Sequence, residues 1–194
     1  MKKILLFTLL ALVFVACSKD DDSLSSDADF FFIGKLDGTA VKHELTATNE
    51  TEMSNSNGGS IGTPDCIFDY GCSIGGFDPG KTYLSVDFSG LFSGDCGTEG
   101  AIFPSLFPTG KWPFGESKGQ VTVVFFDGTE LWSSAKGGQA SDADFTVTKS
   151  EKLETVFGQS MSIRGTVSCT LYSDSGASKK LEAGSYSLNF VPYF

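Results

Sequence analysis

Histidine is almost absent from this chain: His43 is the one imidazole among 194 residues. A serine or cysteine nucleophile needs a base within hydrogen-bond reach, so His43 would have to serve any such nucleophile. We also expect no nucleophile elbow, the strand-to-helix turn that presents a catalytic serine in many hydrolases. The sequence therefore predicts no catalytic residue and no enzyme, and we expect His43 to lie on the surface.

Metal-binding patterns are also lacking. No two cysteines have the Cys-x-x-Cys spacing of a zinc site, and no segment has the Asp-x-Asp-x-Asp-Gly spacing of an EF-hand loop. Two groups of acids could supply oxygen ligands for a structural calcium ion: Asp65, Asp69 and Asp78 in one, Asp142 and Asp144 in the other. Because aspartate is common in turns, we expect turn-forming roles for them and predict no cofactor and no metal.

Basic residues are few, since 14 lysines and arginines stand against 24 aspartates and glutamates, which gives a net charge of −10. Phosphate backbones and anionic lipid surfaces repel so acidic a chain, which argues against nucleic acid as a partner. The charge is compatible with a soluble domain that binds cations or neutral ligands such as sugars.

No apolar run is long enough to span a membrane. Residues 4–16 are apolar except for Thr8, and the run is shorter than the roughly 20 residues that a transmembrane helix needs. Two lysines precede it, Ala16 ends it and Cys17 follows. A basic start, a short apolar core and a small residue before cysteine resemble a bacterial lipoprotein signal. The resemblance implies a signal peptide over residues 1–16 and attachment of a membrane lipid at Cys17.

A polar segment follows the cysteine. Residues 17–29 hold one large apolar side chain, Leu24, and predict a flexible acidic tether ahead of a folded domain over residues 30–194. The tether contains a lysine followed by three acids: Lys19, Asp20, Asp21 and Asp22. This run resembles the export signal of surface lipoproteins from Bacteroidetes-type bacteria. The resemblance implies an outer-membrane lipoprotein that is exposed at the cell surface.

Aromatic residues and glycines are abundant, with 18 phenylalanines and 23 glycines. Aromatic strands joined by glycine turns are typical of all-β proteins, and long runs of helix-forming residues are absent. Asp37-Gly38 and Asp127-Gly128 each lie between two β-prone runs, which predicts a hairpin at each position. We expect a single all-β domain with a β-sandwich or jelly-roll-like arrangement, and a closed barrel is the alternative.

The alternation of apolar residues predicts strands over residues 30–36, 41–48, 67–70, 82–89, 120–126, 130–134, 144–148, 162–172 and 185–191. Residues 49–63 and 90–100 are rich in Gly, Ser, Asn and Thr, which predicts two loops. Residues 150–156 could hold one helical turn. Three prolines within residues 101–115 exclude a long regular element there.

Parts of this pattern carry a second resemblance. Residues 165–172 and 181–186, together with Asp37-Gly38 after an aromatic strand, are similar to small β-sandwich lipoproteins of the same bacteria, whose function is uncharacterised. The similarity covers most of the chain after residue 17 and consists of short strand and turn patterns. It implies a fold and a location, and it implies no chemistry.

Four cysteines remain besides Cys17: Cys66, Cys72, Cys96 and Cys169. In an extracytoplasmic protein they can form disulfides, and four cysteines allow three pairings. We favour Cys66 with Cys72 and Cys96 with Cys169. Cys169 shares the parity of the apolar residues Val167 and Leu171, which directs its side chain into the core. A buried free thiol is therefore the alternative at that position.

Aromatic side chains are the predicted ligand-binding residues: Phe107, Trp112 and Phe114 in the proline-interrupted segment, and Trp132 after the second hairpin. A flat ring on a rigid β surface can stack on a sugar, and prolines hold such a ring still at little entropic cost. The alternative is that these rings fill the core or cover a sheet edge.

We therefore expect a lipid-anchored surface protein that binds a glycan or another extracellular ligand. The first alternative is a structural or assembly subunit that pairs with partner proteins through exposed strand edges. The second is a glycoside hydrolase, which would need two carboxylates placed across a cleft.

Replacing the predicted lipid-attachment residue tests the anchor. Cys17→Ala should leave the protein unacylated, because no thiol remains to carry the lipid, and should release it from the membrane fraction. Cell fractionation followed by gel mobility measures both effects. A variant that stays in the membrane fraction with unchanged mobility would show that Cys17 carries no lipid.

Overall fold

The computed structural model describes residues 26–47, 50–62, 65–155 and 158–193. The predicted signal peptide, Cys17 and the export signal at residues 19–22 lie outside these ranges. Within the described ranges, no helix is both long enough and apolar enough to cross a membrane.

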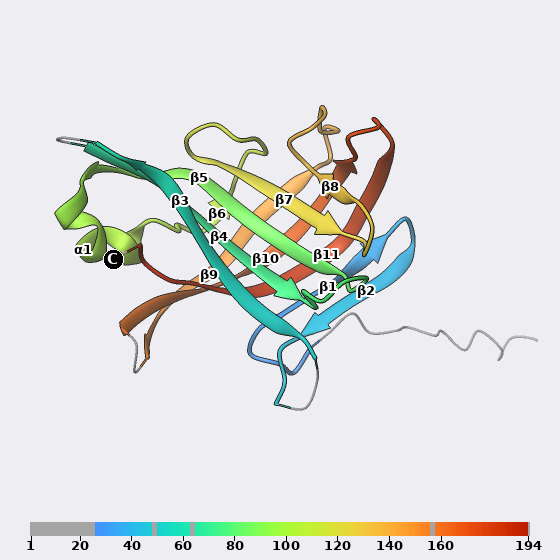
Figure 1. Cartoon of the computed structure of the whole chain (residues 1–194), viewed down its shortest axis with the longest axis horizontal. Helices are drawn as coiled ribbons and strands as arrows, with labels where there is room; N and C mark the ends of the chain where they lie inside the picture. The colour runs from blue at the N-terminus through green and yellow to red at the C-terminus, as the bar shows by residue number, and fades with distance from the viewer. Residues whose placement is uncertain (1–25, 48–49, 63–64, 156–157, 194) are drawn as a thin grey trace, which may run out of the picture.

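Antiparallel strands dominate the described chain (Figure 1). The strands are β1 Phe31–Leu36, β2 Thr39–Glu44, β3 Glu52–Ile61, β4 Asp65–Gly75, β5 Tyr83–Asp95, β6 Gly110–Lys111, β7 Gln120–Phe126, β8 Leu131–Ser133, β9 Asp144–Thr155, β10 Gly158–Tyr172 and β11 Ser178–Phe190. Three short helical segments follow β5: η1 Cys96–Thr98, α1 Glu99–Ile102 and η2 Phe103–Ser105. The predicted all-β class is confirmed.

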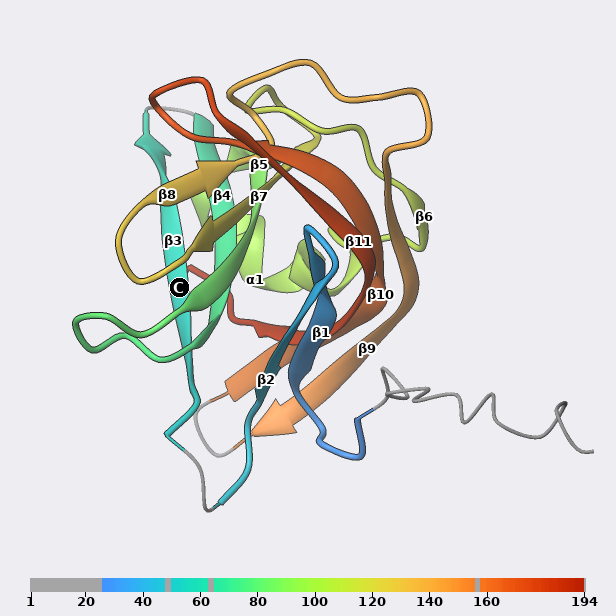
Figure 2. The ribbon, with the colours of Figure 1, turned by 90° about the vertical axis from the view of Figure 1, so that its right-hand side faces the viewer.

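All the strands belong to one sheet, which folds over on itself. The strand order is β2-β1-β11-β10-β8-β7-β5-β4-β3, with β9 also paired to β10, and β6 to β9. The joint between β10 and β8 is a single residue pair, Tyr172 with Ser133. On one side of this joint lies the back half (β1, β2, β6, β9, β10, β11), and on the other lies the front half (β3, β4, β5, β7, β8). The halves face each other across the core (Figure 2), which is a sandwich-like arrangement.

The sheet remains open, because β2 and β3 stand at the two ends of the strand order among the described strands. The closed-barrel alternative is therefore wrong, and no second described strand pairs with either end strand.

Aromatic side chains fill the space between the halves. The ring of Phe88 on β5 packs edge-on against Phe107, Phe145 and Phe190, with centroid distances of 5.5, 5.7 and 5.5 Å. Phe145 lies on β9 and Phe190 on β11, so one ring of the front half contacts two strands of the back half. Burial of a phenylalanine side chain contributes roughly 1.5–3 kcal/mol, so this cluster stabilises the contact between the halves.

Three predictions of irregular structure are wrong. Within the predicted loop at residues 90–100, β5 continues to Asp95. The predicted loop at residues 49–63 contains β3, although this strand consists mainly of Ser, Asn and Gly. Its pairing with β4 runs without interruption from Glu52 opposite Gly75 to Ile61 opposite Cys66, and this ladder outweighs the low β-propensity of the residues. β9 likewise extends to Thr155 alongside β10, where one helical turn was expected.

His43 is buried, which corrects the expected surface position. Its side chain is 7% exposed and lies on β2 opposite Phe32 of β1. Burial removes water from the charged imidazolium and lowers the pKa of His43. Its Nε2 atom has no hydrogen-bond partner among the described residues. His43 is therefore a neutral residue of the core.

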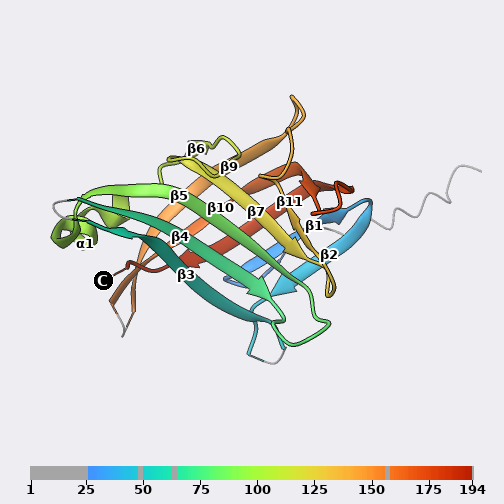
Figure 3. The ribbon, with the colours of Figure 1, turned by 45° about the horizontal axis from the view of Figure 1, so that its top comes forward.

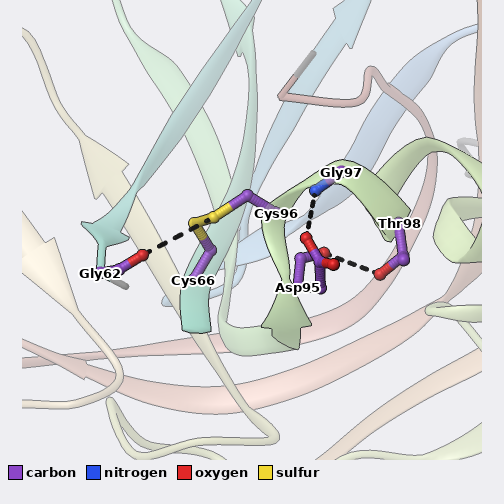
Figure 4. The surroundings of a disulfide bond; sticks show 6 residues. All are labelled: Gly62, Cys66, Asp95, Cys96, Gly97 and Thr98. Atoms are coloured by element: carbon purple, nitrogen blue, oxygen red, sulfur yellow. Dashed lines mark hydrogen bonds between the residues drawn. A yellow bond between two sulfur atoms is a disulfide. The ribbon is translucent and has the colours of Figure 1, made fainter. Parts of the chain in front are cut away.

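The favoured disulfide pairing is also wrong, although one disulfide forms. Cys66 of β4 is bonded to Cys96, which directly follows β5, and their Cα atoms are 5.2 Å apart (Figure 4). The β4–β5 ladder explains this choice, because it places Cys66 opposite Gly94. Cys72 lies roughly 20 Å further along the same strand at about 3.3 Å per residue, beyond the reach of a disulfide.

Cys72 and Cys169 are free, buried thiols. The inward orientation predicted for Cys169 from its parity is confirmed, and so is the alternative of a free thiol there. Burial raises the pKa of Cys72 and of Cys169 to about 12. Because the thiolate is the reactive form, both thiols are expected to be inert.

The disulfide should contribute measurably to stability. It joins residues separated by 30 positions, and closing such a loop stabilises a fold by about 3.6 kcal/mol in the chain-entropy description. Urea unfolding with and without reductant measures this contribution. Reductant should lower the free energy of unfolding of the native chain and of a Cys72→Ala/Cys169→Ala variant, but not that of Cys66→Ala/Cys96→Ala. If reductant leaves the free energy of unfolding of the native chain unchanged, the assigned Cys66–Cys96 disulfide is contradicted.

Candidate functional site

Prolines divide the segment between β5 and β7 into short pieces, as predicted. The longest described helix within it, α1, has four residues, and β6 has two. These turns direct Phe103 and Phe107 into the core, whereas Trp112 and Phe114 further along remain half-buried. Phe107, a predicted ligand-binding residue, is 1% exposed and therefore serves the core.

Trp112 is held in place by three contacts. Its backbone N–H donates to the carbonyl O of Phe145 at 2.8 Å, and its Nε1–H donates to the carbonyl O of Pro108 at 3.3 Å. Its ring packs edge-on against Phe88, with 5.0 Å between the centroids. The indole thus contacts the core, while part of its surface is open to solvent.

Trp112 and Phe114 lie together at a hollow of about 410 Å³, which we call the aromatic hollow. The loop between β8 and β9 forms its other wall and contributes Ser134, Gly137 and Gly138. Such a hollow offers a flat apolar surface on one side and backbone and hydroxyl groups on the other. This combination suits a ligand with both an apolar face and polar edges.

Gln139 fixes the loop that forms this second wall. Its Nε2 donates to the carbonyl O of Ser134 at 2.7 Å and to that of Thr170 at 2.8 Å. Its Oε1 accepts from the backbone N–H of Thr170 at 2.9 Å. Because Thr170 belongs to β10, the loop is tied to the back half, and the hollow is formed before any ligand arrives.

A second hollow, of about 500 Å³, lies on the outer face of the front half, whose strands run side by side in Figure 3. We call it the acidic groove because three carboxylates and one amine line it: Asp69, Asp87, Glu116 and Lys136. Ser56, Ser89, Thr122 and Ser133 add hydroxyl groups to its polar lining, and Asn57 adds an amide. The groove therefore has many groups that can exchange hydrogen bonds with a polar ligand.

Asp87 reaches the groove because Gly71 stands opposite it. The β4–β5 ladder pairs these two residues, and a Cβ atom at position 71 would collide with Asp87 Oδ1 and with Ser56 Oγ. Only glycine leaves the space in which the carboxylate lies.

Hydrogen bonds orient both aspartates of the groove. Asp87 Oδ2 accepts from Ser85 Oγ at 2.9 Å, and Asp69 Oδ1 accepts from the backbone N–H of Gly90 at 2.5 Å. Burial raises the pKa of Asp87, the hydrogen bond from Ser85 opposes this rise, and the negative charge of Asp69 adds to it. Asp87 therefore retains its proton to a higher pH than an ordinary aspartate.

The two hollows share their walls. The segment after β6 contributes Trp112 and Phe114 to the aromatic hollow and Glu116 to the acidic groove. The chain after β8 contributes Ser134 to the former and Lys136 to the latter. Residues 112–116 and 133–136 therefore separate an aromatic site from a polar one, and a ligand longer than one ring could contact both.

Trp132 has a structural environment. It is 7% exposed, its Nε1–H donates to Asp127 Oδ2 at 2.8 Å, and the Lys179 amine lies 4.0 Å from the ring centroid. Lys179 also pairs with Asp127 at 2.7 Å. This arrangement joins the β7–β8 hairpin to β11 and covers the indole face, which matches the alternative that the ring covers part of the sheet.

The aspartates considered as calcium ligands form no metal-binding group among the described residues. Asp69 lines the groove, Asp144 pairs with Lys111 at 2.7 Å, and the carbonyl O of Asp78 accepts from the Lys81 N–H in a turn. Asp65 lies at the start of β4, and Asp142 precedes β9. Within the described residues no three His, Cys, Asp or Glu side chains are grouped so that they could hold a metal ion.

Two Gly-x-Ser-x-Gly strings occur, at residues 58–62 and 71–75. Their serines, Ser60 and Ser73, lie within the paired strands β3 and β4. Neither string forms the strand-to-helix turn that exposes a catalytic serine.

This chain was compared with known proteins, and no family model, no curated protein and no solved structure matches it. The functional argument therefore depends on the geometry of the two hollows.

Proposed function

We propose that this protein is a lipid-anchored cell-surface module that binds a glycan at the aromatic hollow. The observation that carries the proposal is the position of Trp112, which is fixed by hydrogen bonds at both nitrogens and lies beside Phe114 at an open hollow. The anchor and the surface location are supported by the sequence around Cys17 and the acids that follow it.

Sugar rings have an apolar face and a rim of hydroxyl groups. An indole can stack on the apolar face, and little entropy is lost because Trp112 is already immobilised. The neighbouring acidic groove offers Asp69, Asp87 and Glu116 as hydrogen-bond partners for hydroxyl groups of an adjoining ring. With a net charge of −10, the chain favours neutral or cationic sugars over anionic ones.

Glycoside hydrolysis is a second candidate, because two of the three carboxyl groups of the acidic groove, those of Asp69 and Asp87, lie on neighbouring strands. One of the two, Asp87, has a raised pKa, as the general acid of a glycosidase requires. Binding and hydrolysis predict different fates for a bound glycan, so one experiment separates them.

A glycan array probed with the chain from residue 24 onward tests the proposal, since this fragment contains every described residue. Trp112→Ala should weaken binding at least about tenfold, or about 1.4 kcal/mol, because the stacking surface is lost. Phe77→Ala is the matched control, since Phe77 is an exposed aromatic residue outside both hollows. Trp112→Phe should bind with intermediate strength, because a smaller ring remains.

Thermal unfolding of each variant verifies that the fold is retained, since Trp112 also contacts Phe88. Equal losses in Trp112→Ala and Phe77→Ala, or no bound glycan at all, would contradict the proposed site. The bound glycan should be recovered intact. Cleavage that Asp87→Asn abolishes would instead make the acidic groove an active site.

A further inference from the structure

Three strands of six or more residues have an edge that is wholly or largely unpaired in the described chain: β2, β3, and β9, which pairs with the two-residue β6 on its outer side. Charged residues protect two of them. β2 carries the Lys42–Glu44 ion pair, and β9 carries Lys149–Glu151 and Lys152–Glu154. Such charges oppose pairing with another strand. β3 differs, because after Glu52 it has no charged residue.

The backbone groups at the β3 edge follow from its ladder with β4. Gly62 N–H donates to the carbonyl O of Asp65. In an antiparallel ladder every second residue is hydrogen-bonded to the partner strand, so this bond shows which residues of β3 are bonded to β4. Even-numbered residues of β3 therefore direct their backbone groups at β4. The odd-numbered residues direct theirs away from it: Met53, Asn55, Asn57, Gly59 and Ile61. β4 is the one described strand that pairs with β3.

We propose that β3 pairs with β3 of a second copy of this chain, antiparallel and about a two-fold axis at Asn57. In this register Met53 lies opposite Ile61 of the second copy, Asn55 opposite Gly59, and Asn57 opposite itself. All the outward backbone groups of the strand are then hydrogen-bonded, two bonds to each pair, and the front halves form one continuous sheet.

The side chains of β3 are compatible with this register. On the outer face Ser54 meets Ser60 of the second copy, and Ser56 meets Gly58, so all the groups are small. On the inner face Ile61, which is 64% exposed, meets Met53, which already packs against the core. The contact therefore covers an exposed apolar side chain and brings no large side chains into collision.

The charges are also compatible with a second copy. Each chain has a net charge of −10, so an interface that opposed acids to acids would be repulsive. Glu52 is the one acid of the strand, and in the proposed register it lies opposite Gly62. Repulsion between the remaining charges is screened over a Debye length of about 8 Å at physiological salt.

Exposed serines allow a test that leaves the fold of one chain unchanged. Ser54 and Ser60 are exposed and lie opposite the uncharged residues Ser73 and Ile67 of β4, so a charge there has no charge directly opposite it within the chain. Ser54→Lys/Ser60→Lys places lysine opposite lysine twice in the proposed dimer. Ser54→Lys/Ser60→Glu places lysine opposite glutamate twice and is the matched control.

Sedimentation velocity of the chain from residue 24 onward, over a series of concentrations, measures the association. The native chain and Ser54→Lys/Ser60→Glu should form dimers, whereas Ser54→Lys/Ser60→Lys should dimerise with an affinity lower by roughly tenfold or more. Hydrogen exchange should show that dimerisation protects the amides of Met53, Asn55, Asn57, Gly59 and Ile61.

A native chain that stays monomeric at every concentration would overturn the proposal, and so would a dimer that both double variants preserve equally. Pairing of β3 with a strand of another protein would appear as protection of the same amides only when that protein is present, together with a monomeric pure chain. Glycan binding at the aromatic hollow is independent of every one of these outcomes.

Discussion

The ring of Phe88 is the contact on which the arrangement of this molecule depends. It belongs to the front half, yet it packs against Phe145 and Phe190 of the back half and against Phe107 and Trp112 of the proline-rich segment. The same ring therefore joins the two halves of the sheet and fixes the tryptophan of the aromatic hollow. Core packing and the geometry of the candidate site therefore depend on the same side chain, and a change at Phe88 must affect both.

Local patterns in the sequence predicted what depends on near neighbours. Alternation located most strands, Asp-Gly pairs located two hairpins, and the parity of Cys169 placed it in the core. What depends on strand register could not be read in this way. The bond between Cys66 and Cys96 requires the β4–β5 ladder, and the polar sequence of β3 becomes a strand only because β4 supplies its hydrogen bonds. His43 is buried because β2 folds onto β1 opposite Phe32.

The candidate site was predicted in part for the same reason. Proline spacing singled out the segment that holds Trp112 and Phe114, which the structure brings together, while Phe107 of the same segment turned into the core. The acidic groove left no signal in the sequence, because Asp69 and Asp87 lie on different strands, which only the β4–β5 ladder places side by side. A glycine opposite an aspartate becomes informative once the register of the two strands is known.

Native-state hydrogen exchange at the Trp112 amide tests most directly whether Phe88 fixes the site. This amide donates to Phe145 and reports whether the segment stays attached to the core. If the account is right, Phe88→Leu accelerates exchange at Trp112 much more than Leu84→Val, a change at another buried position of β5. Equal acceleration in the two variants would mean that the segment is held independently of Phe88, which would contradict the account.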